Sequence, residues 1–147
     1  MTATGHAIIG TVIAVKIGNP ALAIPLAVAS HVAADAFPHW DEGTNAFRKS
    51  KKKIITQAVA DVVLGFVLSA LIVFLFFPAT NLFYAFLMVI AAQALDWLTA
   101  PYYFFKIKSF KIFYKFQKLF DHELNKPWGI INQIAILVFI LLLAIIL

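Results

Sequence analysis

Long apolar segments separated by short polar stretches dominate this chain and place it among membrane proteins. Five of them are candidates for membrane-spanning helices, which take about 20 residues each: residues 3–18, 20–37, 54–77, 81–105 and 128–147. Only 13% of the residues are charged, about half the share in a soluble domain. The sequence therefore predicts an all-α fold, a polytopic membrane protein with about five transmembrane helices in a single domain over residues 1–147.

The first two segments are short and rich in small residues, which predicts a close-packed helical hairpin. Gly18 and Asn19, followed by Pro20, indicate the tight turn between them. Glycine and alanine let two helix backbones approach closely in lipid. At 1.5 Å per residue each helix is roughly 25 Å long, near the lower limit for crossing a bilayer. A re-entrant hairpin is therefore an alternative to two full spans.

The positive charges lie almost entirely on one side of these segments. Of the 12 Lys and Arg residues only Lys16 falls on the other side, and the rest lie within residues 48–53 and 106–126. Cytoplasmic loops of membrane proteins carry an excess of Lys and Arg. We therefore expect an integral protein of a bacterial or archaeal cytoplasmic membrane, with its N-terminus and basic face inside and its C-terminus outside.

Residues 106–120 have the pattern of an interfacial amphipathic helix. Lysines occupy one helical stripe and apolar side chains lie largely opposite: Lys108, Lys111, Lys115 and Lys118 against Ile112, Phe113, Phe116, Leu119 and Phe120. Lysines at this position bind anionic headgroups, while aromatic side chains enter the acyl boundary. The expected partners of the Lys106 to Lys118 stretch are thus membrane lipids. No nucleic acid is expected, because the positive charge follows the membrane topology.

Histidines and aspartates gather near the basic side, where the first hairpin would bring them together. His6 precedes the turn at 18–19 by about as many residues as His31 follows it, so both reach nearly the same height. His31 and Asp35 are four residues apart and share a helical face. Helix is disfavoured just before Pro38, so the residues after it can fold back. The candidate metal ligands are His6, His31, Asp35, His39, Asp41 and, just before the last segment, His122.

Asp61 and Asp96 stand alone in apolar segments, roughly two helical turns from the basic side. A carboxylate at such depth costs several kcal/mol unless it is paired or neutralised, so it usually has a function. We expect both to be catalytic, as a general base or as ligands of a second metal ion. The alternative is an ion pair with a lysine that reaches down from the surface.

The chain has no cysteine, so a metal ion here must be held by imidazole and carboxylate groups. This donor set favours Zn²⁺, with Mn²⁺ or Fe²⁺ as alternatives, and the number of ligands suits one or two ions. A divalent ion lowers the pKa of bound water towards neutrality and so supplies a nucleophile for hydrolysis.

The stretch from His6 to SHVAADAFPHWD resembles small bacterial integral membrane proteins described as membrane-bound metal-dependent hydrolases. In these, an early His precedes a second His and then a D-x-x-P-H-x-D stretch, and the resemblance covers residues 5–43. HVAAD also resembles the HxxxD ligand pair of zinc-dependent phospholipase C enzymes, although this chain lacks their further His/Glu motifs. The resemblance implies a membrane-embedded hydrolase that holds a metal at these residues.

Together these features favour a metal-dependent hydrolase acting on a phosphoester or ester of a lipid or lipid-linked substrate at the cytoplasmic membrane face. Two other classes stay open. One is an ion- or proton-coupled transporter or channel that uses Asp61 and Asp96. The other is a structural membrane protein whose metal staples its helices. Five short spans leave little room for alternating access unless the protein forms a homo-oligomer.

Overall fold

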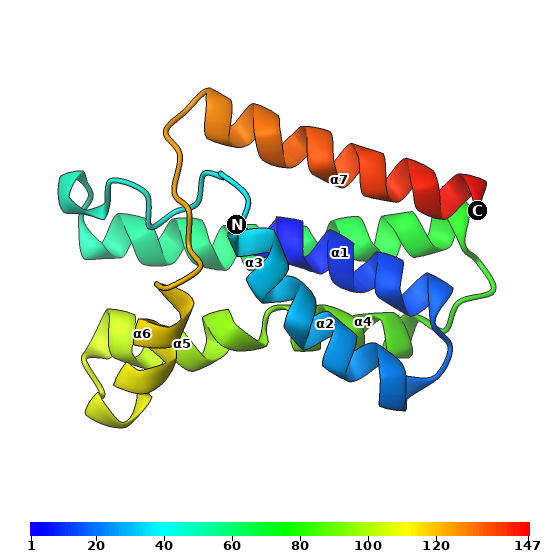
Figure 1. Cartoon of the computed structure of the whole chain (residues 1–147), viewed down its shortest axis with the longest axis horizontal. Helices are drawn as coiled ribbons and strands as arrows, with labels where there is room; N and C mark the ends of the chain where they lie inside the picture. Colours follow the sequence, from blue (N-terminus) through cyan, green and yellow to red (C-terminus); the bar gives the residue numbers. More distant parts are fainter.

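The structure, a computed structural model, describes all residues 1–147 and contains only helices and connecting loops. Its helices in chain order are α1 (Ala3–Lys16), α2 (Pro20–Asp35), α3 (Lys51–Phe76), α4 (Leu82–Ala92), α5 (Ala94–Phe105), α6 (Lys111–Gln117) and α7 (Trp128–Ile146). Short 3₁₀ helices cover Ala46–Arg48 and Lys108–Phe110. Helix α1 lies at the centre and packs against α2, α3, α4 and α7 (Figure 1). The expectation of an all-α fold is confirmed.

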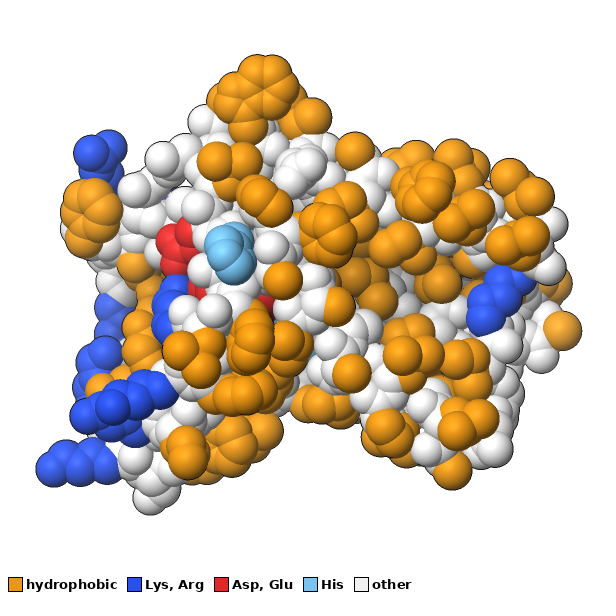
Figure 2. All heavy atoms as spheres, viewed as in Figure 1, with side chains coloured by type: hydrophobic (Ala, Val, Ile, Leu, Met, Phe, Trp, Pro, Cys, Tyr) orange, Lys and Arg blue, Asp and Glu red, His pale blue; other side chains and the backbone are white.

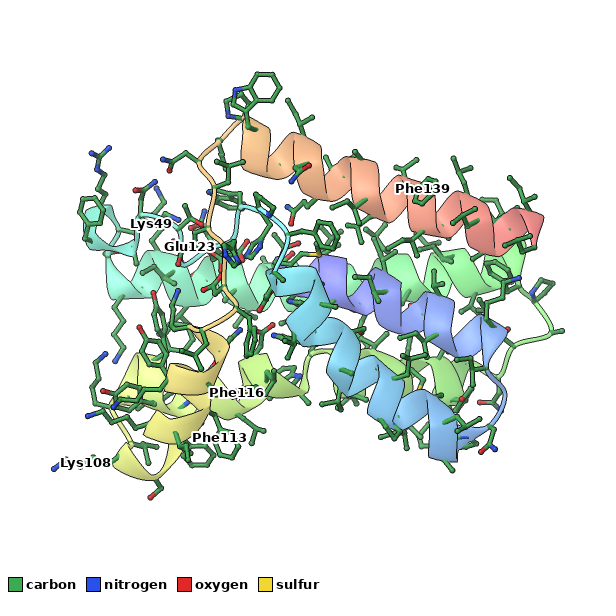
Figure 3. All side chains as sticks on the ribbon, viewed as in Figure 1. Lys49, Lys108, Phe113, Phe116, Glu123 and Phe139 are labelled. Carbon is green, nitrogen blue, oxygen red and sulfur yellow. The ribbon has the colours of Figure 1, made fainter.

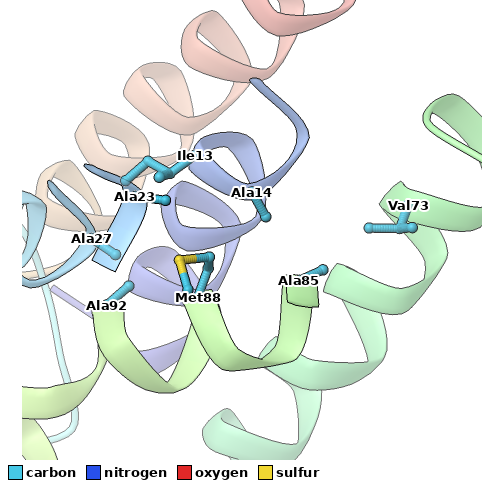
Figure 4. Close-up of a cluster of buried hydrophobic side chains, with 8 residues drawn as sticks. All are labelled: Ile13, Ala14, Ala23, Ala27, Val73, Ala85, Met88 and Ala92. Atoms are coloured by element: carbon cyan, nitrogen blue, oxygen red, sulfur yellow. The ribbon is translucent and has the colours of Figure 1, made fainter. Parts of the chain in front are cut away.

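Small side chains allow α1 to take this central place. Buried side chains of α1 and of the helices around it form a cluster of mostly short side chains with one methionine (Figure 4): Ile13, Ala14, Ala23, Ala27, Val73, Ala85, Met88 and Ala92. A Cβ atom at Gly10 would lie 2.7 Å from the carbonyl oxygen of Met88, so only glycine permits this approach of α1 to α4. Backbones in close contact gain packing energy in lipid, where the hydrophobic effect does not drive helices together.

The turn between α1 and α2 forms where its residue types predict it. Asn19 caps α2 by accepting a hydrogen bond from the backbone N–H of Ala21 at 3.0 Å. Pro20 occupies the first helical position, where its missing N–H has no partner to lose. The two helices pack against each other as an antiparallel hairpin.

Two helices, α3 and α7, are long and apolar enough to cross a membrane. A third span results if α4 and α5, which meet at a 48° bend, are counted together. Helices α1 and α2 are apolar but shorter than a full span, as their predicted length of roughly 25 Å indicated. Five full-length spans are therefore not confirmed.

The predicted span 81–105 is wrong as a single helix, because it breaks at Gln93. The side-chain amide of Gln93 donates to the carbonyl oxygen of Ala3 at 2.9 Å. The carbonyl oxygen of Ala92, next to the break, accepts a hydrogen bond from His31. Partners on α1 and α2 thus satisfy polar groups at the break, which is how irregular helices are tolerated at membrane depth.

The predicted interfacial helix 106–120 is also shorter than expected. Lys106 adopts a left-handed conformation (φ 58°) that ends α5, and a 3₁₀ turn over 108–110 precedes the seven-residue α6. Figure 3 shows Lys108 extending from the end of the molecule, with Phe113 and Phe116 on α6. Lysines and aromatic side chains therefore still meet at this end of the structure.

The molecular surface is strongly apolar away from one charged end. Large hydrophobic side chains on α2, α3, α4 and α7 point outward, among them Phe139, which is 62% exposed (Figure 3). Figure 2 shows basic side chains gathered at one end, with acidic and histidine side chains beside them. Apolar exposure on this scale fits a lipid environment and not a water-facing surface.

Candidate metal centre

The candidate site lies where the start of α1, the end of α2 and the α4–α5 break meet. Its central residues are almost completely buried, with at most 1% of their surface exposed: His6, His31, Asp35 and His39. Residues 117–123 cover these groups from the basic end. Backbone hydrogen bonds join the cover to α2, since the N–H of His122 donates to the carbonyl oxygen of Asp35 at 3.0 Å.

His6 and His31 face each other across the hairpin. Their rings stack with centroids 3.8 Å apart and planes inclined by 8°, which confirms the prediction from the position of the turn. Asp35 bridges them: its Oδ1 lies 3.2 Å from His6 Nε2, and its Oδ2 lies 3.2 Å from His31 Nε2. The N-terminal ammonium of Met1 also contacts Asp35 Oδ1.

A backbone hydrogen bond fixes the tautomer of His31. Its Nδ1–H donates to the carbonyl oxygen of Ala92 at 2.7 Å, so that in the neutral ring Nε2 carries a lone pair. That lone pair faces carboxylate oxygens of Asp35 at 3.2 Å and Asp96 at 3.6 Å. Acceptors that face one another in this way need a donor or a cation between them, and here the side-chain amide of Gln117 and the ammonium of Met1 lie against them. A backbone acceptor on the other ring nitrogen is the arrangement typical of metal-bound histidine.

A second group of the same kind surrounds His39. Its Nδ1–H donates to the carbonyl oxygen of Phe37 at 2.8 Å, and its Nε2 lies 3.2 Å from Asp121 Oδ1. Both of these facing atoms are buried without a hydrogen-bond partner. Together with a carboxylate oxygen of Asp41 they lie within 4.8 Å of one another, close enough to hold a metal ion. Atoms of His6, His31 and Asp96 satisfy the same criterion in the first group.

The two aspartates of the apolar segments have different surroundings. Asp96 joins the first group and is about one-third exposed, with 35% of its side chain accessible. Asp61 instead accepts from the backbone N–H of Thr4 at 3.3 Å, while Thr4 Oγ1 donates to the carbonyl oxygen of Asp61 at 2.9 Å. Asp61 thus lies at the positive end of the α1 dipole. It belongs to neither group of candidate ligands.

His122 contributes its backbone and not its ring to the site. The side chain is exposed, and its Nδ1 contacts the carbonyl oxygen of Phe120 at 2.9 Å. The carbonyl oxygen of His122 accepts from the N–H of His39 at 3.1 Å, which holds the His39 loop against residues 121–123. The neighbouring Asp121 is the side chain that reaches His39. In the sequence, the only signal for this contact of Asp121 was its position next to His122.

Gln117, at the end of α6, was not among the predicted site residues. Its Nε2 donates to Asp96 Oδ1 at 2.9 Å and to Asp35 Oδ2 at 3.3 Å, and it lies 3.2 Å from His31 Nε2. The amide therefore occupies a position surrounded by the acceptors of the first group. Rotation of the amide by 180° would present Oε1, an oxygen that a metal ion can bind.

Two carboxyl groups outside the apolar helices flank the site and have opposite pKa shifts. Burial raises the pKa of Asp121, but the contacts with His39 and Lys118 outweigh it, so the pKa lies below its ordinary value. Asp121 is therefore ionised at neutral pH. Burial, together with the nearby charge of Asp61, raises the pKa of Glu42 to about 7.

Comparisons with protein-family models, with curated proteins and with solved structures find no match to this chain. The geometry of the two residue groups is thus the basis for assigning a function.

Proposed function

We propose that the protein is an integral membrane, metal-dependent hydrolase that cleaves a phosphoester or ester of a lipid or lipid-linked substrate. The observation that carries the proposal is the pair of buried imidazoles, His31 and His39. Each donates its Nδ1–H to a backbone carbonyl and turns Nε2 towards carboxylate oxygens. The Nε2 atom of His39 and both ring nitrogens of His6 have no hydrogen-bond partner, and buried nitrogens of this kind are costly without a cation.

The residues present fit one or two divalent ions. His6, His31 and Asp35 would hold the first, next to Asp96, and His39, Asp41 and Asp121 would hold the second. Nitrogen and oxygen donors without sulfur favour Zn²⁺, with Mn²⁺ or Fe²⁺ next. When bound, such an ion lowers the pKa of water and polarises a phosphoryl or carbonyl oxygen.

Asp96 is the best placed general base. It is partly accessible, it lines the cavity next to the site, and Gln117 fixes its Oδ1 by a 2.9 Å hydrogen bond. Its carboxylate takes a proton from the attacking water as the water oxygen bonds to phosphorus or to the acyl carbon. The bond to the leaving alkoxide then breaks, and the same proton passes from Asp96 to the alkoxide. The alkoxide leaves as an alcohol.

The charged end of the molecule supports a lipid substrate at the cytoplasmic face. Lysines and aromatic side chains of the 106–120 region lie at that end, close to the loops that cover the site (Figures 2 and 3). We place this end in the cytoplasm, as the distribution of Lys and Arg favours. Helices α3, α7 and the bent α4–α5 pair then cross the membrane, and the short α1–α2 hairpin reaches into it from the basic side.

Metal analysis of two histidine variants tests the proposal. Purified wild-type protein should retain Zn²⁺ through gel filtration and hydrolyse fluorogenic lipid esters or phosphoesters. His31→Ala should lose both properties, whereas His122→Ala, which removes an exposed ring, should keep both. Metal retention by His31→Ala at the wild-type level would contradict the site. Tight metal binding without hydrolysis of any such substrate would favour the helix-stapling role.

A further inference from the structure

A cavity of about 400 Å³ lies between α3 and α5, beside both groups of candidate ligands. It follows from the 48° bend at Gln93, because α4 packs against α3, whereas α5 beyond the bend packs against α6. Pockets that bind small molecules range over about 300–1,000 Å³. The cavity therefore has the size of a site for one small ligand.

The inner end of the cavity is polar and reaches both ligand groups. Asp96 of the first group and Asp41 and Asp121 of the second all contribute to its lining. Gln93, which is 1% exposed, adds a side-chain oxygen that has no hydrogen-bond partner. A molecule in the cavity would thus meet both candidate metal positions at one end.

Most of the remaining exposed wall is apolar, although Glu42 and, on α3, Asp61 also line the cavity. The most exposed hydrophobic lining residues, with about half to two-thirds of their surface accessible, are Val59 and Val63 on α3 and Trp97 and Phe105 on α5. Lys51 lies 5.0 Å from the ring centre of Phe105, so a cation stands at the rim near the basic end. In the proposed topology, in which α3 and α5 cross the bilayer, an opening between these two helices faces the hydrocarbon.

We propose that this cavity holds one hydrocarbon chain of the substrate, which enters laterally from the bilayer. The inference rests on the proposed hydrolase function and narrows its substrate to a molecule whose ester or phosphoester adjoins a single buried chain. The scissile group then lies at the polar end, near Asp96 and Asp121. A water-soluble substrate would leave most of the exposed wall, which is apolar, without a partner.

Photolabelling of the full-length protein tests the proposal without any catalysis. The probe is a fatty acid with a mid-chain diazirine, added to EDTA-treated protein in phosphatidylcholine nanodiscs, with dodecylphosphonate as competitor. Labelled peptides are identified by mass spectrometry. We expect competable labels on the cavity faces of α3 and α5.

A matched pair of variants on α3 provides the control. Ala58 lines the cavity, whereas Ala60, two residues further on, is exposed and does not. Each buried methylene contributes about fourfold in affinity, so Ala58→Phe, by displacing two or more, should lower competable labelling roughly tenfold. Ala60→Phe should leave it unchanged. Ala100→Phe on α5 repeats the test from the opposite wall.

Labels spread over α2 and α7, with the same yield in Ala58→Phe and Ala100→Phe, would overturn the proposal. Because the labelling is done without metal, that result would leave the metal centre untouched. Conversely, competable cavity labels in a protein that binds no metal would support the chain-binding cavity and refute the hydrolase.

Discussion

Gly10→Ala should lower both the unfolding free energy and the metal affinity of the protein, because α4, which contacts α1 at Gly10, also accepts the hydrogen bond of His31. The new Cβ would lie 2.7 Å from the carbonyl oxygen of Met88 and 2.9 Å from the Cβ of Ala92. Ordinary van der Waals contact begins at 3.4 Å, so the two helices must separate by about 0.7 Å. Overpacking of this kind costs about 1–3 kcal/mol of unfolding free energy.

The same displacement lengthens the hydrogen bond that fixes the tautomer of His31. Its Nδ1 is 2.7 Å from the carbonyl oxygen of Ala92 on α4. If α4 moves by the amount that Gly10→Ala requires, this hydrogen bond lengthens beyond the usual limit of about 3.2 Å. Loss of such a supporting contact lowers metal affinity by roughly 10- to 100-fold. We therefore expect both a lower thermal midpoint and a weaker Zn²⁺ affinity.

Gly18→Ala is the matched control, since a Cβ there meets nothing within 4 Å and the residue has no positive φ. Thermal unfolding in detergent and Zn²⁺ titration against a competing chelator measure both effects. Equal stability and equal metal affinity in the two variants would refute the argument that helix contact supports the site.

Three further predictions follow from the site and the topology. Asp96→Asn should abolish hydrolysis and lower metal affinity, whereas Asp61→Asn should only reduce the unfolding free energy by about 1 kcal/mol, as loss of a helix-capping contact does. Metal titration and unfolding of both variants measure these effects, and equal effects in the two variants would contradict the prediction. Gln117→Ala should lower the rate of lipid phosphoester hydrolysis more than Gln57→Ala does, because of these two glutamines only Gln117 contacts Asp96. Equal hydrolysis rates in the two variants would exclude a role of Gln117 in positioning Asp96. Reporter fusions at Leu147 should be active only outside the cytoplasm, since α7 starts at the basic end, and cytoplasmic activity would reverse the orientation.

The local parts of the fold could be predicted because they depend on neighbours in sequence. Gly18, Asn19 and Pro20 define the turn, and helical periodicity then brings His6 opposite His31. The four-residue spacing of His31 and Asp35 likewise placed both on one face. These features need only backbone geometry and spacing.

The parts that escaped prediction depend on contacts between distant segments. The break at Gln93 is stabilised by Ala3 and His31, which lie far away in the sequence. Gln117 reaches the site only because α5 turns away at that break and brings α6 with it. Asp61 lies on the apolar helix α3, and its partner is the backbone of Thr4, which is far away in the sequence.

The most direct test of the central claim is X-ray absorption at the zinc edge of the Zn²⁺-loaded protein. The account predicts nitrogen and oxygen donors at about 2.0–2.2 Å, with the outer-shell scattering of imidazole rings and no sulfur. In His31→Ala this imidazole signal should fall, while in His122→Ala it should persist. A zinc spectrum showing only water-like oxygen donors, or one unchanged by His31→Ala, would contradict a metal centre at these residues.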